Sequence, residues 1–198
     1  MNGAERFLGG SLDECLNQAC LALGARTEEL QYEVIEDSPA VVTIEAALDP
    51  VAVLGLFLRE AFNAGDLDIR ARIEEAEEHL GGELYGEDFR LLTAGLGKGL
   101  DSLQYLCNRI MNGRLRSHAP VHLDGDGFKM RRAGRLQEDA EAAAERAIQR
   151  RGPVTMGPFT PAARREIHLA LADHPSVETA SDGEGFLKQV VVRPFRLR

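Results

Sequence analysis

An arginine and a histidine stand four residues apart near the end of the chain, at Arg164 and His168. Thr160 is a natural N-cap and Pro161 suits the first helical position, so the apolar pattern that follows them predicts a short helix. Residues four apart lie on one face of a helix, which places the guanidinium beside the imidazole. The cation of such a pair can bind a phosphate, while the ring can stack or form a hydrogen bond.

A polar segment, residues 179–184, begins eleven residues after the histidine. Its composition favours a turn with glycine, and the apolar run at residues 190–192 predicts a strand. An Arg–His pair alone is usually part of a solvated helix face. Here the spaced elements together resemble the small single-stranded nucleic-acid-binding domain named for its Arg-x-x-x-His signature. The resemblance covers the chain from about residue 136 to its end, and it implies nucleic-acid binding by Arg164, Arg165, His168, Thr179, Ser181 and Gly183.

The charge of the chain is divided unevenly along its 198 residues. The total of −9 at first argues against binding to nucleic acid. Residues 1–127 carry 10 basic and 23 acidic side chains (net −13), whereas residues 128–198 carry 13 and 9 (net +4). The basic part is therefore the part with the Arg-x-x-x-His signature, and we expect its binding to nucleic acid to depend steeply on salt.

A glycine-rich stretch, residues 94–99, precedes a helical pattern whose apolar face includes Leu100, Leu103 and Cys107. Free N–H groups at a helix N-terminus favour a phosphate. The spacing does not fit a dinucleotide-binding loop, which needs a further glycine, nor a phosphate-binding loop, which needs a Gly-Lys pair at a fixed distance from an earlier glycine. Both of these nucleotide sites are excluded.

The predicted order of helix, strand, strand, helix, glycine loop, helix and strand in residues 49–127 resembles a bacterial-type K-homology (KH) domain. Residues 86–88, 100–106 and 124–132 are similar to the SpoIIIJ-associated (Jag) RNA-binding protein family. That family has Gly-Lys-Arg-Gly in the KH loop, whereas this chain has Ala-Gly-Leu-Gly at residues 94–97 and lacks both cations. Either the backbone N–H groups still clamp a phosphate, or the KH fold is retained as a packing module. The weaker binding candidates in this loop are Gly95, Leu96, Gly97 and Lys98.

The first part of the chain shows a capping box at Ser11 and Glu14, followed by an apolar helix face and an alternating strand pattern at residues 31–35. Residues 39–48 are either a linker or a further strand. We therefore predict an α+β protein with three small α/β modules in tandem. They are a strand–helix–strand module at residues 1–38, a KH domain with a degenerate glycine loop at residues 49–127, and the Arg-x-x-x-His domain, with a three-stranded sheet and two helices, at residues 128–198.

The Jag resemblance implies a non-catalytic, regulatory protein that binds single-stranded RNA, or single-stranded DNA. It further implies a small KH-domain partner protein and an association with the membrane-insertion or cell-envelope machinery. The alternative is a protein-interaction scaffold whose nucleic-acid surfaces have decayed, which the charge of −13 on residues 1–127 favours. An RNA-binding assay separates the two.

Catalytic and metal-binding patterns are missing from the sequence. It has no nucleophile–base set and no complete nucleotide loop, and its three cysteines show no metal-ligand spacing. The acidic stretch at residues 124–127 fails as a calcium loop, because Phe128 and Arg135 occupy ligand positions. No apolar run approaches the roughly 20 residues of a membrane span, and no signal pattern opens the chain. We expect a cytosolic protein without cofactor, metal or enzymatic activity.

Overall fold

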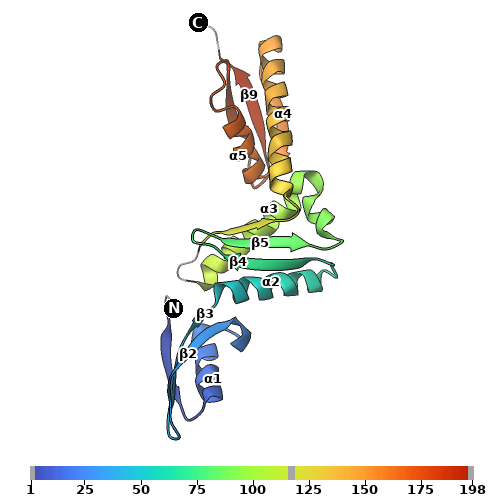
Figure 1. Ribbon diagram of the computed structural model, residues 1–198. Helices are drawn as coiled ribbons and strands as arrows, with labels where there is room; N and C mark the ends of the chain where they lie inside the picture. Colours follow the sequence, from blue (N-terminus) through green and yellow to red (C-terminus); the bar gives the residue numbers. More distant parts are fainter. Residues whose placement is uncertain (1–2, 116–118, 196–198) are drawn as a thin grey trace. The chain divides into compact units, whose positions relative to one another are not determined.

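The computed structural model describes residues 3–115 and 119–195, and it confirms the α+β class with three small three-stranded sheets, each accompanied by helices (Figure 1). The chain forms two compact units. The first comprises residues 1–87 and 104–123, and the second comprises residues 88–103 and 124–198. The KH loop region thus packs in the same unit as the Arg-x-x-x-His signature.

The N-terminal sheet has the order β1 (Glu5–Gly9), β3 (Val42–Leu48) and β2 (Leu30–Asp37), with antiparallel pairing throughout. Helix α1 (Leu12–Leu23) covers it. The segment that the sequence left open between linker and strand therefore contains the central strand β3. Its position between two partners explains its apolar composition, and its buried residues join the core of the module.

The capping box before α1 forms with one difference from the prediction. Ser11 Oγ accepts a hydrogen bond from the Glu14 backbone N–H at 3.3 Å, as expected for an N-cap. The Glu14 carboxylate accepts from the Gly10 N–H at 2.9 Å, one residue earlier than the Ser11 N–H of the predicted box. The helix ends at Gly24, whose φ of 60° gives a left-handed cap.

The first unit also holds helix α2 (Pro50–Ala64) and the sheet β4 (Arg70–Glu75), β5 (Leu80–Tyr85) and β6 (Val121–Asp124), with the order β4-β5-β6. Asp49 caps helix α2, because its carboxylate accepts a hydrogen bond from the Val51 N–H at 2.9 Å. Strand β4 begins at Arg70, three residues after the alternation of apolar and charged residues starts at Leu67.

Helix α3 (Phe89–Arg114) is interrupted where the glycine loop was predicted. Ala94 is extended, and Gly95, Leu96 and Gly97 all adopt left-handed conformations with φ of 59°, 63° and 75°. The predicted KH order is therefore present from α2 to β6. Residues 88–103 of the chain lie in the second unit, and residues 104–114 of α3 lie in the first.

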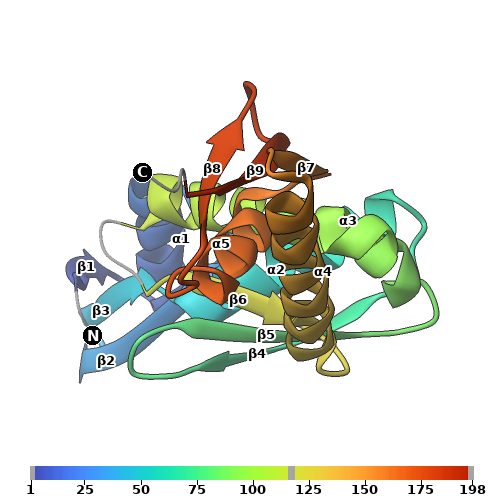
Figure 2. The same cartoon turned by 90° about the horizontal axis from the view of Figure 1, so that it is seen from above.

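The rest of the second unit consists of helix α4 (Phe128–Arg150), β7 (Val154–Phe159), α5 (Pro161–Ala170), β8 (Val177–Asp182) and β9 (Lys188–Pro194). The sheet has the antiparallel order β7-β9-β8. Helices α4 and α5 pack side by side (Figure 2). Their buried residues form one core with the sheet, made of Leu136, Ala140, Ala143, Ala144, Ala147, Phe159, Ala163, Ile167, Leu171, Val177, Val190 and Val192.

Two predictions for this unit are wrong in their bounds. The apolar helical pattern predicted a helix over residues 132–151, whereas helix α4 begins at Phe128, after Gly127 in a left-handed conformation. Residues 179–182, which were predicted as part of a polar turn, lie in strand β8. Their polar side chains alternate along the strand instead of forming a loop, so the site has a rigid sheet beneath it.

Candidate nucleic-acid interface

Helix α5 begins as its sequence predicts. Thr160 Oγ1 accepts a hydrogen bond from the Ala163 N–H at 3.3 Å, and Pro161 occupies the first turn, where no N–H partner is needed. Ala163 and Ile167 are buried against the core, which fixes the rotation of the helix. Arg164 and His168 are half-buried beside that stripe.

Both ring nitrogens of His168 contact hydroxyl groups of strand β8. Nδ1 lies 2.6 Å from Thr179 Oγ1, and Nε2 lies 2.9 Å from Ser181 Oγ. A neutral imidazole has one donor and one acceptor nitrogen, and a hydroxyl can serve either. His168 therefore bridges helix α5 to strand β8 and fixes the orientation of both hydroxyls.

The two hydroxyls reach the same imidazole because successive side chains of a strand point to opposite faces. Val177 is buried in the core, so Thr179 and Ser181 share its face of β8. Antiparallel pairing of Thr179 with Val192 and of Ser181 with Val190 holds this register. Val177, Thr179 and Ser181 recur at every second position, which is the period of a strand, although the polar composition of residues 179–184 predicted a turn.

Burial and charge both keep His168 neutral. Partial burial, followed by the positive charge of the neighbouring Arg164, lowers the pKa of His168 below its ordinary value of 6.5. The neutral form is the one that can accept from one hydroxyl while donating to the other. The bridge is therefore suited to neutral pH.

The basic residues of α5 differ in their surroundings. Arg164 Nη1 is buried and has no hydrogen-bond partner among the described residues. Arg165 is exposed, and Glu166, the acid that follows it, is engaged by the buried Arg132, with Nη2 to Oε1 at 2.8 Å. Within helix α5, the acidic charge of Glu166 is thus offset by Arg132, and the other charged residues are Arg164 and Arg165. We call the surface formed by Arg164, Arg165, His168, Thr179 and Ser181 the α5–β8 face.

The remaining predicted site residues lie elsewhere in the second unit. Gly183 has φ of 106° in the exposed turn between β8 and β9, two residues beyond the Ser181 hydroxyl. Gly95 is exposed in the α3 loop, whereas Gly97 is buried and Leu96 and Lys98 are half-buried. The structure thus brings His168, Thr179 and Ser181 together beside Arg164, and the KH loop forms a separate group.

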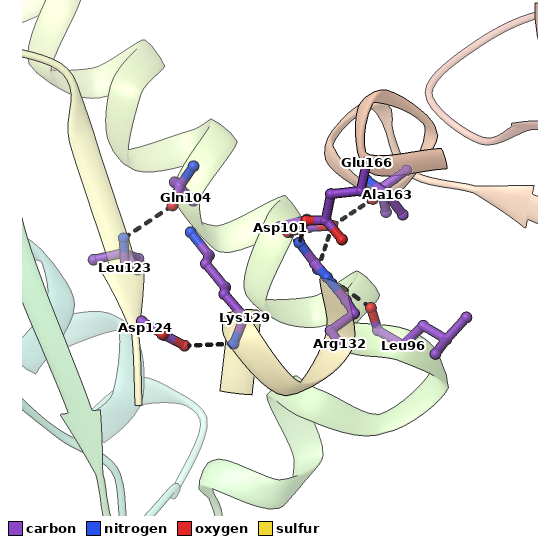
Figure 3. Close-up of polar contacts among 10 residues, drawn as sticks. Leu96, Asp101, Gln104, Leu123, Asp124, Lys129, Arg132, Ala163 and Glu166 are labelled. Carbon is purple, nitrogen blue, oxygen red and sulfur yellow. Dashed lines mark hydrogen bonds and ion pairs between the residues drawn. The ribbon is translucent and has the colours of Figure 1, made fainter. Parts of the chain in front are cut away.

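A buried polar network in the second unit was not predicted (Figure 3). Arg132 Nη1 donates to both carboxylate oxygens of Asp101 at 3.0 Å, and Nη2 donates to Glu166. Thr160 Oγ1 donates to Asp101 Oδ2, so the cap of α5 is tied to the same carboxylate. Burial disfavours the charged guanidinium, but its hydrogen bonds to Glu166 and Asp101 outweigh this and raise the pKa of Arg132.

Sequence offered only a weak signal for this network. Arg132 was one of several arginines in a basic helix start, and its partners lie 31 and 34 residues away. The one local hint was the hydrophobic Leu96 in the loop position where the related family carries a cation.

Features of other site classes are absent from the described parts of the chain. No group of three or more His, Cys, Asp or Glu residues could hold a metal ion in residues 3–115 and 119–195. Within the same residues, no helix combines the length and the apolar character that a bilayer span requires. The cysteines are free thiols, and burial raises the pKa of Cys107 to about 12.

Comparison with known proteins agrees with this architecture. Residues 135–194 match the family model of the Arg-x-x-x-His domain. The chain is 29% identical to the RNA-binding protein KhpB of Clostridium symbiosum over 92% of its own length and 87% of that relative. It is also 35% identical to the RNA-binding protein KhpB of Lactiplantibacillus plantarum, over 52% of the chain and 32% of that relative.

The Arg-x-x-x-His domain match contains the whole α5–β8 face, and the similarity to the first KhpB extends over both compact units. The resemblance to the Jag family, which rested on short motifs, is thereby confirmed on nearly the full length. Residues 135–194 are an Arg-x-x-x-His domain, and the chain is a homologue of the Jag-family protein KhpB.

Proposed function

We propose that this chain is a non-catalytic, cytosolic regulatory protein that binds single-stranded RNA through the α5–β8 face. The observation that carries the proposal is the bridge from His168 to Thr179 and Ser181 beside Arg164. It presents ordered hydroxyls and a cation on one rigid surface. Two relatives of the chain, both named as RNA-binding proteins, give further support.

The roles of the residues follow from their chemistry. Arg164 and Arg165 provide the positive charge for phosphates, with the forked donor geometry that suits a phosphate oxygen pair. His168 holds the Thr179 and Ser181 hydroxyls in place, and its ring is also available for stacking on a base. Gly183 keeps the neighbouring turn free of a side chain.

Binding of the full chain to a short fluorescent single-stranded RNA of mixed sequence tests the proposal. We expect binding that weakens steeply with salt, because contacts to phosphates release counterions. Unlabelled single-stranded RNA should compete better than a duplex of the same sequence. Absence of binding even at low salt would contradict the proposal.

A protein-interaction scaffold is the second candidate, and it is favoured by the net charge of −13 on residues 1–127. Such a surface repels nucleic acid and suits a basic protein partner. The Jag resemblance extends the main proposal to a small KH-domain partner protein. A chain that binds no RNA but forms a stable complex with that partner would support the scaffold.

A further inference from the structure

The KH loop of this chain has a backbone that is unfavourable for one of its residues. Gly95, Leu96 and Gly97 are all left-handed, and Leu96 is the one with a side chain in this conformation. A Cβ in the left-handed region meets the following carbonyl oxygen, so Leu96 is strained. Packing around the loop must compensate for that strain.

The compensating contacts come from the Arg-x-x-x-His part of the same unit. The Leu96 side chain packs against the buried core built from α4, α5 and the sheet β7-β9-β8. Its carbonyl oxygen accepts a hydrogen bond from Arg132 Nη1 at 3.3 Å. Leu96 is therefore a half-buried residue whose side chain packs on an apolar core and whose carbonyl is held by a buried arginine.

Gly97 packs closely against the first turns of helix α4. A Cβ at this position would lie 2.5 Å from Phe128 Cε1 and 3.2 Å from Arg132 Nη1. At Gly95 the nearest atom is Lys98 Cδ, at 3.9 Å. The loop is thus in close contact with α4 at Gly97, whereas there is free space around Gly95.

The residues after the loop extend the same contact. Asp101 is buried, with 6% of its surface exposed, and it binds both Arg132 of α4 and Thr160 at the start of α5. Arg132, with 2% exposed, also reaches Glu166 of α5. Buried charges need this degree of pairing, so the network holds the loop to both helices of the Arg-x-x-x-His domain.

We propose that the KH signature loop of this chain is the docking surface for its own Arg-x-x-x-His domain, and that the occupant of the loop is the start of helix α4. A nucleic-acid backbone at Gly97 would compete for the space filled by Phe128 and Arg132. An apolar residue at position 96 fits this role, because the Leu96 side chain packs against the apolar core of the second unit. The inference concerns the KH loop alone and does not depend on RNA binding by the α5–β8 face.

A matched pair of substitutions in the full chain tests this docking. Gly95→Ala and Gly97→Ala introduce the same strain, because both residues are left-handed, but the new Cβ of Gly97→Ala alone meets Phe128. Hydrogen exchange by mass spectrometry should show faster exchange for residues 94–103 and 128–136 in Gly97→Ala, with Gly95→Ala close to the parent. The Tm of Gly97→Ala should also be lower, by roughly 2 °C or more. Equal effects of the two substitutions would overturn the proposal.

Removal of the Phe128 ring provides a second readout if Gly97→Ala folds poorly. In the Phe128→Ala background, Gly97→Ala should have a much smaller effect than in the parent, because the clashing ring is gone. If Gly97→Ala is as harmful with the ring as without it, the loop does not dock on α4.

RNA titration of the same proteins distinguishes docking from an RNA site in the loop. We expect Gly95→Ala and Lys98→Ala to keep the parental RNA affinity within about twofold, which is under 0.5 kcal/mol. Leu96→Arg, which restores a family cation, should lose exchange protection in α4 without a gain in RNA affinity. Higher affinity of Leu96→Arg at unchanged protection would overturn the docking role, and it would leave the proposal for the α5–β8 face intact.

Discussion

At the scale of single residues, the proposed RNA-binding face is built around an imidazole whose two nitrogens both contact groups of the protein. His168 contacts Thr179 and Ser181 through hydrogen bonds, so it orients groups of the α5–β8 face as well as belonging to that face. Protonation would turn both nitrogens into donors and add a positive charge next to Arg164. The bridge should therefore respond to pH.

We predict that His168 makes the protein less stable in mild acid. Its pKa is lowered in the folded state, so the unfolded chain binds more protons, and the free energy of unfolding falls as the pH drops from about 6.5 towards the lowered value. Urea unfolding at pH 7.5 and pH 5.5 measures this loss. The control is His174→Gln, because His174 is also half-buried and lies six residues after His168.

In His168→Gln the loss of stability between these two pH values should be smaller than in the parent, and in His174→Gln it should be retained. An identical pH dependence in all three proteins would show that the pKa of His168 is the same in the folded and unfolded states, which contradicts the prediction.

At the scale of elements, the first turns of helix α4 connect helix α3 to helix α5 within the second unit. Helix α4 contributes Phe128 against the loop of α3 and Arg132 to Asp101 and Glu166, so three helical segments meet at its first turns. The position follows from the early start of α4 at Phe128. A helix from Arg132 onward, as the sequence pattern predicted, would leave the first of these contacts to a flexible connection.

Substitutions of two adjacent arginines of α4 compare how much a buried ion pair and an exposed ion pair contribute to the free energy of unfolding. Arg132→Met should cost about 3–5 kcal/mol, because it leaves the buried Asp101 without its cation. Arg131→Met should cost no more than about 1 kcal/mol, because its ion pair with Asp126 is exposed. Equilibrium unfolding in urea gives both values. Similar losses for the two variants would contradict the buried network.

The sequence predicted elements where local chemistry decides them. Thr160 and Pro161 marked the start of α5, and Ser11 marked the start of α1, because caps act within one turn. Strand β8 was missed because its Thr and Ser are typical of turns, and its strand character comes from pairing with β9.

The network around Arg132 was beyond prediction for a different reason. Its partners, at Asp101, Thr160 and Glu166, are brought together by the packing of three helices, and no short-range pattern encodes that packing. The Arg–His pair, by contrast, was found because one helical turn separates its members. The hydroxyls that complete the bridge were included through the family resemblance, and the structure supplies their geometry.

At the scale of the whole molecule, acidic and basic residues are segregated along the sequence. Residues 1–127 are strongly acidic and residues 128–198 are basic, so binding to RNA by the Arg-x-x-x-His domain must rely on a few local cations. Two such cations, Arg164 and Arg165, follow each other on α5, where the nearest acid, Glu166, is paired internally.

The salt dependence of RNA binding by the full chain and by Arg164→Ala tests the central claim most directly. A phosphate contact on a single strand contributes about 0.7 to the slope of log K against log salt concentration, so Arg164→Ala should flatten the slope by about that amount. Its affinity should fall by roughly tenfold or more, since a charge-assisted hydrogen bond contributes about 1.5–3 kcal/mol. Arg146→Ala, which removes an exposed arginine of α4, should keep the parental slope and affinity. An unchanged slope and affinity for Arg164→Ala, in a protein of parental stability, would contradict the account.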